Sequence, residues 1–210
     1  MNLQAVTLQG QHARLEPLHF DHAVALSEAV QDGELWRLWY TAIPTPAAMV
    51  SEIQRRLDLQ SSGSMLPFAV IHLPDERMAG MTTYMNIDNS NRRLEIGSTW
   101  YRHSVQRTAL NTEFKRLLLG HAFEELKCIA VEFRTHVFNQ QSRRAIERLG
   151  AKLDGVLRQH QINRHPLAQE ALRDTCVYSI IDSEWQNVKL HLDFQINDRK
   201  FVRTHATHTV

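Results

Sequence analysis

The sequence predicts a single α/β domain of the α+β type, whose mixed, mostly antiparallel sheet is flanked by helices. The chain has 210 residues, enough for one good hydrophobic core and too few for two comfortable domains. Three strand-like segments joined by short turns occupy residues 65–101, and helices alternate with strands after them. The first pattern is typical of an antiparallel meander, and the second supplies helices that cover a sheet.

The bulk composition excludes several classes of protein. Lys and Arg number 24 against 23 Asp and Glu, so no global field favours nucleic acid or a membrane surface as a partner. The cysteines, Cys128 and Cys176, stand in apolar runs and are interpreted as buried reduced thiols. No segment has the ~20 apolar residues of a membrane span, and the N-terminus lacks a signal-peptide pattern. We therefore expect a cytoplasmic protein.

The N-terminal third predicts one strand and two helices. Residues 12–18 alternate weakly between apolar and polar and predict the strand. Asp21 is expected to cap the first helix. Thr45 and Pro46 have the residue types of a cap and a first helical turn, and Ser and Gly at 61–64 end the second helix.

The middle of the chain predicts three consecutive strands. They cover residues 65–73, 78–87 and 92–101, and the turns between them contain Pro, Asp, Asn and Ser. Turns this short can join only antiparallel neighbours, so we expect a meander.

The remaining elements are also readable from apolar spacing. The expected helices are 111–126 and 139–149, the second stopped by Gly150, and the expected strands are 129–135, 152–163 and 175–181. The domain is expected to span 1–185, with residues 186–210 as a loosely ordered C-terminal extension.

The segment 102–112 joins a strand to the start of a long helix. The first N–H groups of a helix lack intrahelical partners and carry the positive end of its dipole, so phosphate is a natural ligand there. Positive charge and hydrogen-bond donors nearby are supplied by Arg102, His103, Arg107, Thr108, Asn111 and Thr112. An ordinary helix start capped by Asn or Thr is an equal alternative, because the segment has no glycine for close backbone approach.

Asn139 follows a strand and opens the next helix, and Ser142 lies one turn later. As a cap, the Asn139 side chain contributes about 1 kcal/mol to helix stability. The Ser142 hydroxyl is placed to donate a proton to a leaving group. Pure capping is the alternative interpretation.

Four segments together resemble the GNAT superfamily of N-acetyltransferases, and most of all the branch that acetylates the N-termini of ribosomal proteins. The matching segments are Leu94-Glu95-Ile96-Gly97 before Trp100-Tyr101, the stretch 106–112 before the long helix, Asn139-x-x-Ser142 before Ala145-Ile146-x-x-Leu149-Gly150-Ala151, and Asp154-Gly155-Val156-Leu157-Arg158. The resemblance covers about residues 10–183.

The resemblance implies a centrally splayed sheet in which strands 92–101 and 129–135 diverge around the pantetheine arm of acetyl-CoA. It implies acetyl-CoA as co-substrate, without a metal. It implies coenzyme contacts from Thr99, Trp100, Tyr101, Gln106, Arg107, Thr108, Ala109, Leu110, Asn111, Thr112, Asn139 and Ser142.

Two departures from the family pattern concern the coenzyme loop and the base. Ala109 and Asn111 stand at two loop positions where the family usually has glycine or another small residue. A positive φ costs alanine about 1 kcal/mol, so we expect a shifted loop or a weaker affinity for acetyl-CoA. Gln161 stands where some relatives have a glutamate, and it cannot act as a base. Glu95, His160 or a water chain are the substitutes.

The expected reaction is direct acetyl transfer from acetyl-CoA to a primary amine, with Ser142 or water protonating the thiolate. Trp36, Trp39 and Tyr40 are candidates for the wall of the acceptor pocket, or are simply core.

Three functions stay open: acetylation of a small amine or amino-acid-like compound, our first hypothesis; acetylation of a protein N-terminal amine; or a non-catalytic binding or regulatory protein. A pocket closed by residues 35–45 favours the first, and an open groove between them and 164–172 favours the second. A homodimer is expected only by similarity to relatives.

Overall fold

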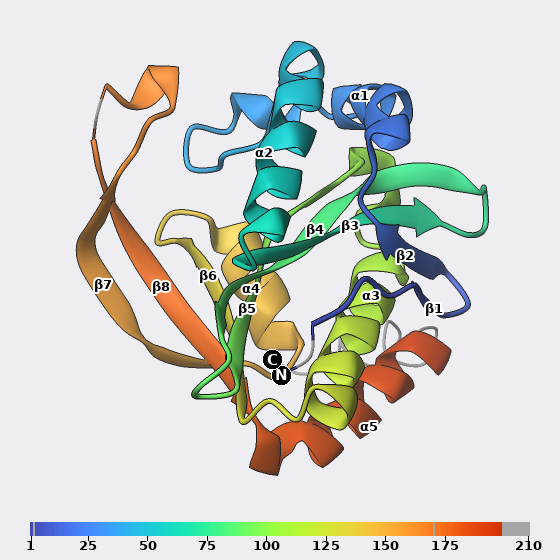
Figure 1. Cartoon of the computed structure of the whole chain (residues 1–210). Helices are drawn as coiled ribbons and strands as arrows, with labels where there is room; N and C mark the ends of the chain where they lie inside the picture. The colour runs from blue at the N-terminus through green and yellow to red at the C-terminus, as the bar shows by residue number, and fades with distance from the viewer. Residues whose placement is uncertain (2, 170, 199–210) are drawn as a thin grey trace, which may run out of the picture.

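The computed structural model describes residues 1, 3–169 and 171–198, and its centre is one eight-stranded sheet (Figure 1). The strand order is β1-β2-β3-β4-β5-β6-β8-β7. The strands are β1 (Leu8–Gln9), β2 (Ala13–Pro17), β3 (Met65–His72), β4 (Arg77–Asp88), β5 (Arg93–Tyr101), β6 (Ala130–His136), β7 (Lys152–Ile162) and β8 (Leu172–Ile181). Every neighbouring pair is antiparallel except β5 and β6, which are parallel. The predicted fold class is confirmed.

Five α-helices accompany the sheet in the described part of the chain. They are α1 (Ala23–Gln31), α2 (Met49–Ser61), α3 (Leu110–Gly120), α4 (Gln140–Arg148) and α5 (Trp185–Asn197). The predicted helix 111–126 is α3 followed by a π-helical turn, His121–Glu125. Gly150 follows α4 at φ +98°, as expected for a residue that ends a helix.

Two helix starts test the N-terminal predictions. Thr45 is confirmed as a cap, because its Oγ1 accepts a hydrogen bond from the Ala48 N–H at 3.3 Å. Asp21 was wrongly expected to cap α1. A short 3-10 turn, Phe20–His22, precedes that helix, so Asp21 lies inside the turn and His22 occupies the cap position.

The sheet splays at its centre. The ladder between β5 and β6 joins only Arg93–Glu95 to Ala130–Glu132, whereas β6 pairs with β8 along its whole length. Beyond Glu95, β5 stays on β4 and leaves β6. A bulge interrupts the β4–β5 register there, and Ser98 has φ +47°. The splay expected from the family resemblance is therefore present.

A buried arginine supports the bulge. Arg56 of α2 is 1% exposed, and its Nη2 donates to the Ser98 carbonyl at 3.1 Å. Its Nη1 donates to Thr83 Oγ1 of β4 at 2.7 Å, and its Nε donates to Glu52 at 2.7 Å. These bonds fix α2 to both strands of the bulge.

Helices cover the two faces of the sheet in separate layers (Figure 1). α1 and α2 bury their apolar residues against Ala69, Met81 and Trp100 on one face. α3, α4 and α5 share a larger core with Phe68, Tyr84, Ile96 and other residues of the opposite face. The splay between β5 and β6 therefore lies between the two layers.

The first turn of α3 also anchors the N-terminal hairpin. The Glu113 carboxylate, 5% exposed, accepts hydrogen bonds from the backbone N–H groups of Gln11, His12 and Ala13 at 2.9, 2.5 and 2.7 Å. A Cβ on Gly10 would stand 2.5 Å from the Glu113 Cδ, so a side chain at this position would displace the carboxylate from its hydrogen bonds.

The first part of the expected loose extension is helical. Residues 186–197 belong to α5, which packs on α3 through an ion pair of 2.8 Å between Arg116 and Asp193. Trp185, at its start, stacks on Phe123 with ring centroids 5.2 Å apart. Residues 199–210 lie outside the described residues.

None of the described helices has the length and apolar character that crossing a bilayer requires. Both cysteines are buried free thiols, as predicted.

Candidate active site

The start of α3 keeps the geometry of a regular helix start in spite of the missing glycines. Ala109 is the cap residue, with φ −69° and ψ −19°, so the strain expected at this alanine is absent. Positive φ falls on Arg107 instead, at +59°. Thr108 Oγ1 accepts from the Leu110 N–H at 3.3 Å and donates to the Val105 carbonyl at 2.6 Å.

The next two N–H groups, of Asn111 and Thr112, have no intrahelical partner in such a turn. Unpartnered N–H groups at the positive end of a helix dipole are suited to bind an anion. Asn111 and Thr112 are almost buried, at 8% and 6% exposed, so their side chains are not the open donors expected from the sequence. Arg102 contributes less than expected, because it is buried and pairs with Asp75 at 3.1 Å.

Asn139 caps α4 as predicted. Its Oδ1 accepts a hydrogen bond from the Ser142 N–H at 3.0 Å. Gln141 of the same turn donates from Nε2 to Gln106 Oε1 at 2.9 Å. The helix start of α4 and the loop before α3, which are 35 residues apart in sequence, therefore meet at one end of the splay.

Of the β5 residues predicted to contact the coenzyme, two have side chains in the core and one has its side chain at the splay. Trp100 is buried against α1 and α2, and Tyr101 packs edge-on to Phe114 at 5.8 Å, so their side chains are structural. Thr99 Oγ1 lies 2.8 Å from Thr82 Oγ1 and also accepts a hydrogen bond from Lys115 Nζ at 2.9 Å.

Lys115 was missed by sequence reasoning. It is 6% exposed, and its Nζ lies 5.3 Å and 5.6 Å from the ring centroids of Phe114 and Phe133. Burial lowers the pKa of Lys115 to about 7, and the negative charge of Glu95 opposes this effect. The signal was available: Lys115 precedes Leu118 and Ala122 at helical spacing on the buried face of α3.

The two side chains predicted as bases lie in different parts of the sheet. Glu95 is 5% exposed, accepts from Asn86 Nδ2 at 2.7 Å and lies 3.5 Å from Arg134 Nε. Burial raises its pKa above the ordinary range, in spite of these partners. His160 is on β7, with Nδ1 3.2 Å from Thr175 Oγ1. Two strands, β6 and β8, separate β7 from β5.

The predicted aromatic wall forms a cluster at the end of β6. Trp39 has ring centroid distances of 5.7 Å to Tyr40, 5.1 Å to His136 and 5.9 Å to Phe138. Trp36 instead packs beside the core of α1 and α2. His136 was not predicted: it is 3% exposed, its Nδ1 accepts from the Phe138 N–H, and its Nε2 has no partner among the described residues. Burial lowers its pKa.

A groove of about 640 Å³ lies beside this cluster. Its walls are Tyr40 to Ile43 on one side and Gln161 to Pro166 with Arg173 on the other. Two hydrogen bonds join the walls: Asn163 Nδ2 donates to the Trp39 carbonyl at 3.0 Å, and His165 Nε2 donates to the Trp36 carbonyl at 3.1 Å. The groove is neither enclosed nor flat, so part of it opens to solvent, and Ile162 in its wall is 59% exposed.

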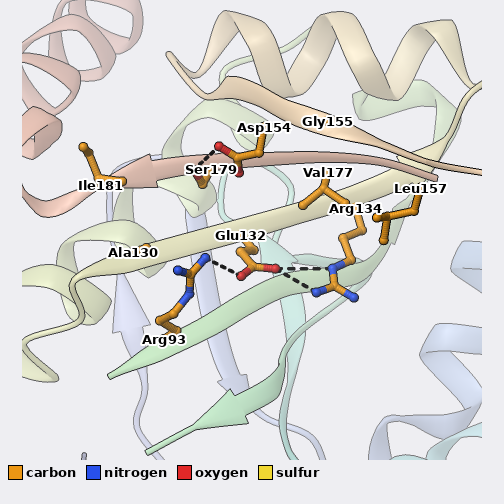
Figure 2. A pocket seen from close by; sticks show the side chains of 10 residues that line it. All are labelled: Arg93, Ala130, Glu132, Arg134, Asp154, Gly155, Leu157, Val177, Ser179 and Ile181. Atoms are coloured by element: carbon orange, nitrogen blue, oxygen red, sulfur yellow. Dashed lines mark hydrogen bonds and ion pairs between the residues drawn. The ribbon is translucent and has the colours of Figure 1, made fainter. Parts of the chain in front are cut away.

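A second hollow, of about 510 Å³, lies on β6, β7 and β8. Figure 2 shows its charged side chains paired with one another: Glu132 bonds to Arg93 at 2.6 Å and to Arg134 at 2.9 Å. Asp154 accepts from the Ser179 hydroxyl at 3.1 Å. Arg134 connects this cluster to Glu95. The described residues contain no group of His, Cys, Asp and Glu side chains placed to hold a metal ion.

The family is decided by a match of residues 12–152, two thirds of the chain, to the model of the acetyltransferase (GNAT) domain. The chain belongs to the GNAT family. GNAT proteins are acyl-transfer enzymes that use acetyl-CoA as co-substrate, so the predicted family and enzyme class are confirmed.

Named relatives agree with this assignment. The chain is 31% identical over 119 residues to "Putative ribosomal N-acetyltransferase YdaF" of Bacillus subtilis; the match covers 56% of this chain and 61% of that protein. It is 31% identical to a GCN5-related N-acetyltransferase of known structure from Brucella melitensis, with a TM-score of 0.78 over 94% of this chain and 88% of the other. RimL, a ribosomal L7/L12 alpha-N-protein acetyltransferase, shares the fold at 19% identity and a TM-score of 0.73, over 85% of this chain and 96% of that one.

The structure brings most of the predicted GNAT site together at one place. The loop 106–112, Thr99, Asn139 and Ser142 gather around the splay, and Trp39 and Tyr40 lie beside it. Trp36 and His160 are not part of this cluster.

Proposed function

We propose that the chain is an acetyl-CoA-dependent N-acetyltransferase that modifies the α-amine at the N-terminus of a protein. The groove between residues 40–43 and 161–166 carries the proposal, because it opens to solvent beside the splay. A chain terminus needs such an opening, since the rest of the polypeptide must leave the site. A small amine fits a closed pocket better.

The coenzyme end of the site fits acetyl-CoA. The N–H groups at the start of α3 suit a pyrophosphate. The unpaired edges of β5 beyond Glu95 and of the facing β6 residues offer backbone groups to pantetheine amides. Ala109 has ordinary helical φ, so its side chain adds no strain to this loop.

The groove has polar groups that suit a peptide backbone. Arg173 lines it and is half-buried, with its Nε donating to Thr175 Oγ1 at 3.1 Å. A guanidinium has five N–H donors, and those left over suit peptide carbonyl oxygens. Tyr40 and Thr41, on the opposite wall, suit the first side chain of the acceptor.

The positions of these polar groups support the following chemistry. The neutral amine attacks the thioester carbon, the C–N bond forms, and the C–S bond breaks. Backbone N–H groups at the splayed part of β5 stabilise the oxyanion. Ser142, at the start of α4, donates a proton to the sulfur.

Mass spectrometry of peptides incubated with the protein and acetyl-CoA tests the proposal. Peptides corresponding to N-termini of ribosomal proteins are compared with the same peptides blocked at the α-amine and with small primary amines. We expect a gain of one acetyl group at the α-amine of the free peptides alone. Acetylation of small amines, with the free peptides unmodified, would show that the groove serves a small acceptor.

A further inference from the structure

The site contains a buried amine for which the reaction above has no role. Lys115 reaches from α3 to Thr99, four residues beyond the last β5 position that pairs with β6. Its Nζ therefore lies at the unpaired part of β5, beside Phe133 of β6, where the proposed function places the thioester arm.

The surroundings suit a neutral amine better than an ammonium ion. An ammonium has three donors, and Thr99 Oγ1 is the hydrogen-bond acceptor of Lys115 among the described residues. The ring faces of Phe114 and Phe133 lie at the outer range of a cation–π contact. A buried charge with so few partners is costly, and the side chain avoids the cost by losing its proton.

The charged group that acts on Lys115 is Glu95 of β5. Around Glu95 stand Glu132, Arg134 and Arg173, whose charges partly cancel. Lowering of the Lys115 pKa to about 7 by burial leaves a substantial neutral fraction at neutral pH. An amine with this pKa is suited to take and return protons near neutrality.

The other base candidates are placed less well. Glu95 is the last β5 residue that pairs with β6, and its carboxylate is engaged by Asn86 and Arg134. His160 is on β7, two strands away from β5. Lys115 bonds directly to the splayed part of β5 at Thr99. His136 lies on the facing part of β6, where its ring packs against Trp39.

We propose that the amine of Lys115 takes the proton from the attacking nitrogen during acetyl transfer. The inference rests on the proposed N-acetyltransferase function. As the C–N bond forms, one N–H proton of the acceptor moves to Nζ. As the C–S bond breaks, the sulfur gains a proton from Ser142, and the ammonium of Lys115 returns one to that hydroxyl. One proton has moved from nitrogen to sulfur, and the enzyme is unchanged.

Lys115→Met tests the proposal, because methionine fills a similar volume without an amine. Lys189→Met on the surface of α5 is the matched control. We expect Lys115→Met to keep the acetyl-CoA Kd within threefold, measured by calorimetry, and to lower kcat at least about 100-fold, the usual contribution of a positioned base. Wild-type kcat should rise to a plateau through about pH 7, and the variant should lose this dependence.

Two further measurements separate the proton transfer from other roles. Lys115→Arg keeps a positive charge but cannot accept a proton, so it should be as inactive as Lys115→Met. NMR of the lysine Cε and Nζ nuclei in the free protein should show one lysine titrating near pH 7 that is absent from Lys115→Met.

Several results would overturn the inference. They are an active Lys115→Arg, a Lys115→Met with kcat within threefold of the wild type, or a Lys115 that stays charged above pH 9. A wild-type protein that acetylates small amines but no free-amine peptide overturns the proposed acceptor and leaves the role of Lys115 to be tested with those amines. A wild-type protein that acetylates neither kind of amine overturns the proposed function and the role of Lys115 with it.

Discussion

Replacing Glu113 by Gln should weaken both the fold and the coenzyme site. The carboxylate accepts three backbone hydrogen bonds from Gln11, His12 and Ala13, and it lies in the first turn of α3. A hydrogen bond to a charged group contributes about 1.5–3 kcal/mol and a neutral one about 1 kcal/mol, so the loss is roughly 1 kcal/mol per bond and about 3 kcal/mol in total. The amide also turns an NH₂ group toward backbone donors.

Urea denaturation and a thermal melt measure this change, with exposed Glu28→Gln on α1 as the matched control. For a domain of this size, about 3 kcal/mol corresponds to a fall in Tm of about 6–12 °C. Acetyl-CoA affinity should fall as well, because the hairpin no longer holds the first turn of α3. A stability loss below about 1 kcal/mol would refute the reasoning, since it would mean that the three bonds contribute little.

Three other substitutions test separate parts of the site. Asn139→Ala should cost about 1 kcal/mol in urea and weaken acetyl-CoA binding in calorimetry, whereas exposed Gln140→Ala should do neither. Trp39→Ala should raise the peptide KM and leave the acetyl-CoA Kd nearly unchanged, because its ring borders the acceptor side; an equal loss of both would contradict this placement. For Lys115, the folded pKa of about 7 lies below the unfolded value of 10.5, so wild-type stability should rise with pH across this window. Lys115→Met should lack that rise and be more stable than the wild type at pH 7; a parallel rise in both proteins would exclude Lys115 as its source.

The elements of the fold were largely readable from local patterns. Residue type and spacing within a few positions determine the elements that were predicted correctly. These are the three meander strands, the caps Thr45 and Asn139, and Gly150 at the end of α4. The Asp21 cap failed because the 3-10 turn before α1 shifts the helix start by one residue, and composition does not distinguish the two arrangements.

The site was less predictable because it depends on contacts between distant residues. The cost assigned to Ala109 assumed a positive φ at that residue, yet the turn places the left-handed conformation at Arg107. Arg102 was expected to face a phosphate, and only the folded chain shows that Asp75 holds it. Lys115 had a readable signal, a lysine on a buried helix face, but its partner Thr99 is defined by tertiary packing.

The hydrogen bond from Arg56 to the Ser98 carbonyl couples the two proposed substrate sites mechanically. α2 belongs to the layer on the acceptor side, and the bulge at Ser98 shapes the strand that faces the thioester. Because the guanidinium is buried and each of its three nitrogens donates a hydrogen bond, a displacement of α2 by an arriving acceptor would carry the bulge with it. A coenzyme that favours one bulge geometry would then also favour one position of α2. Because such coupling is reciprocal, each substrate would change the binding affinity of the protein for the other.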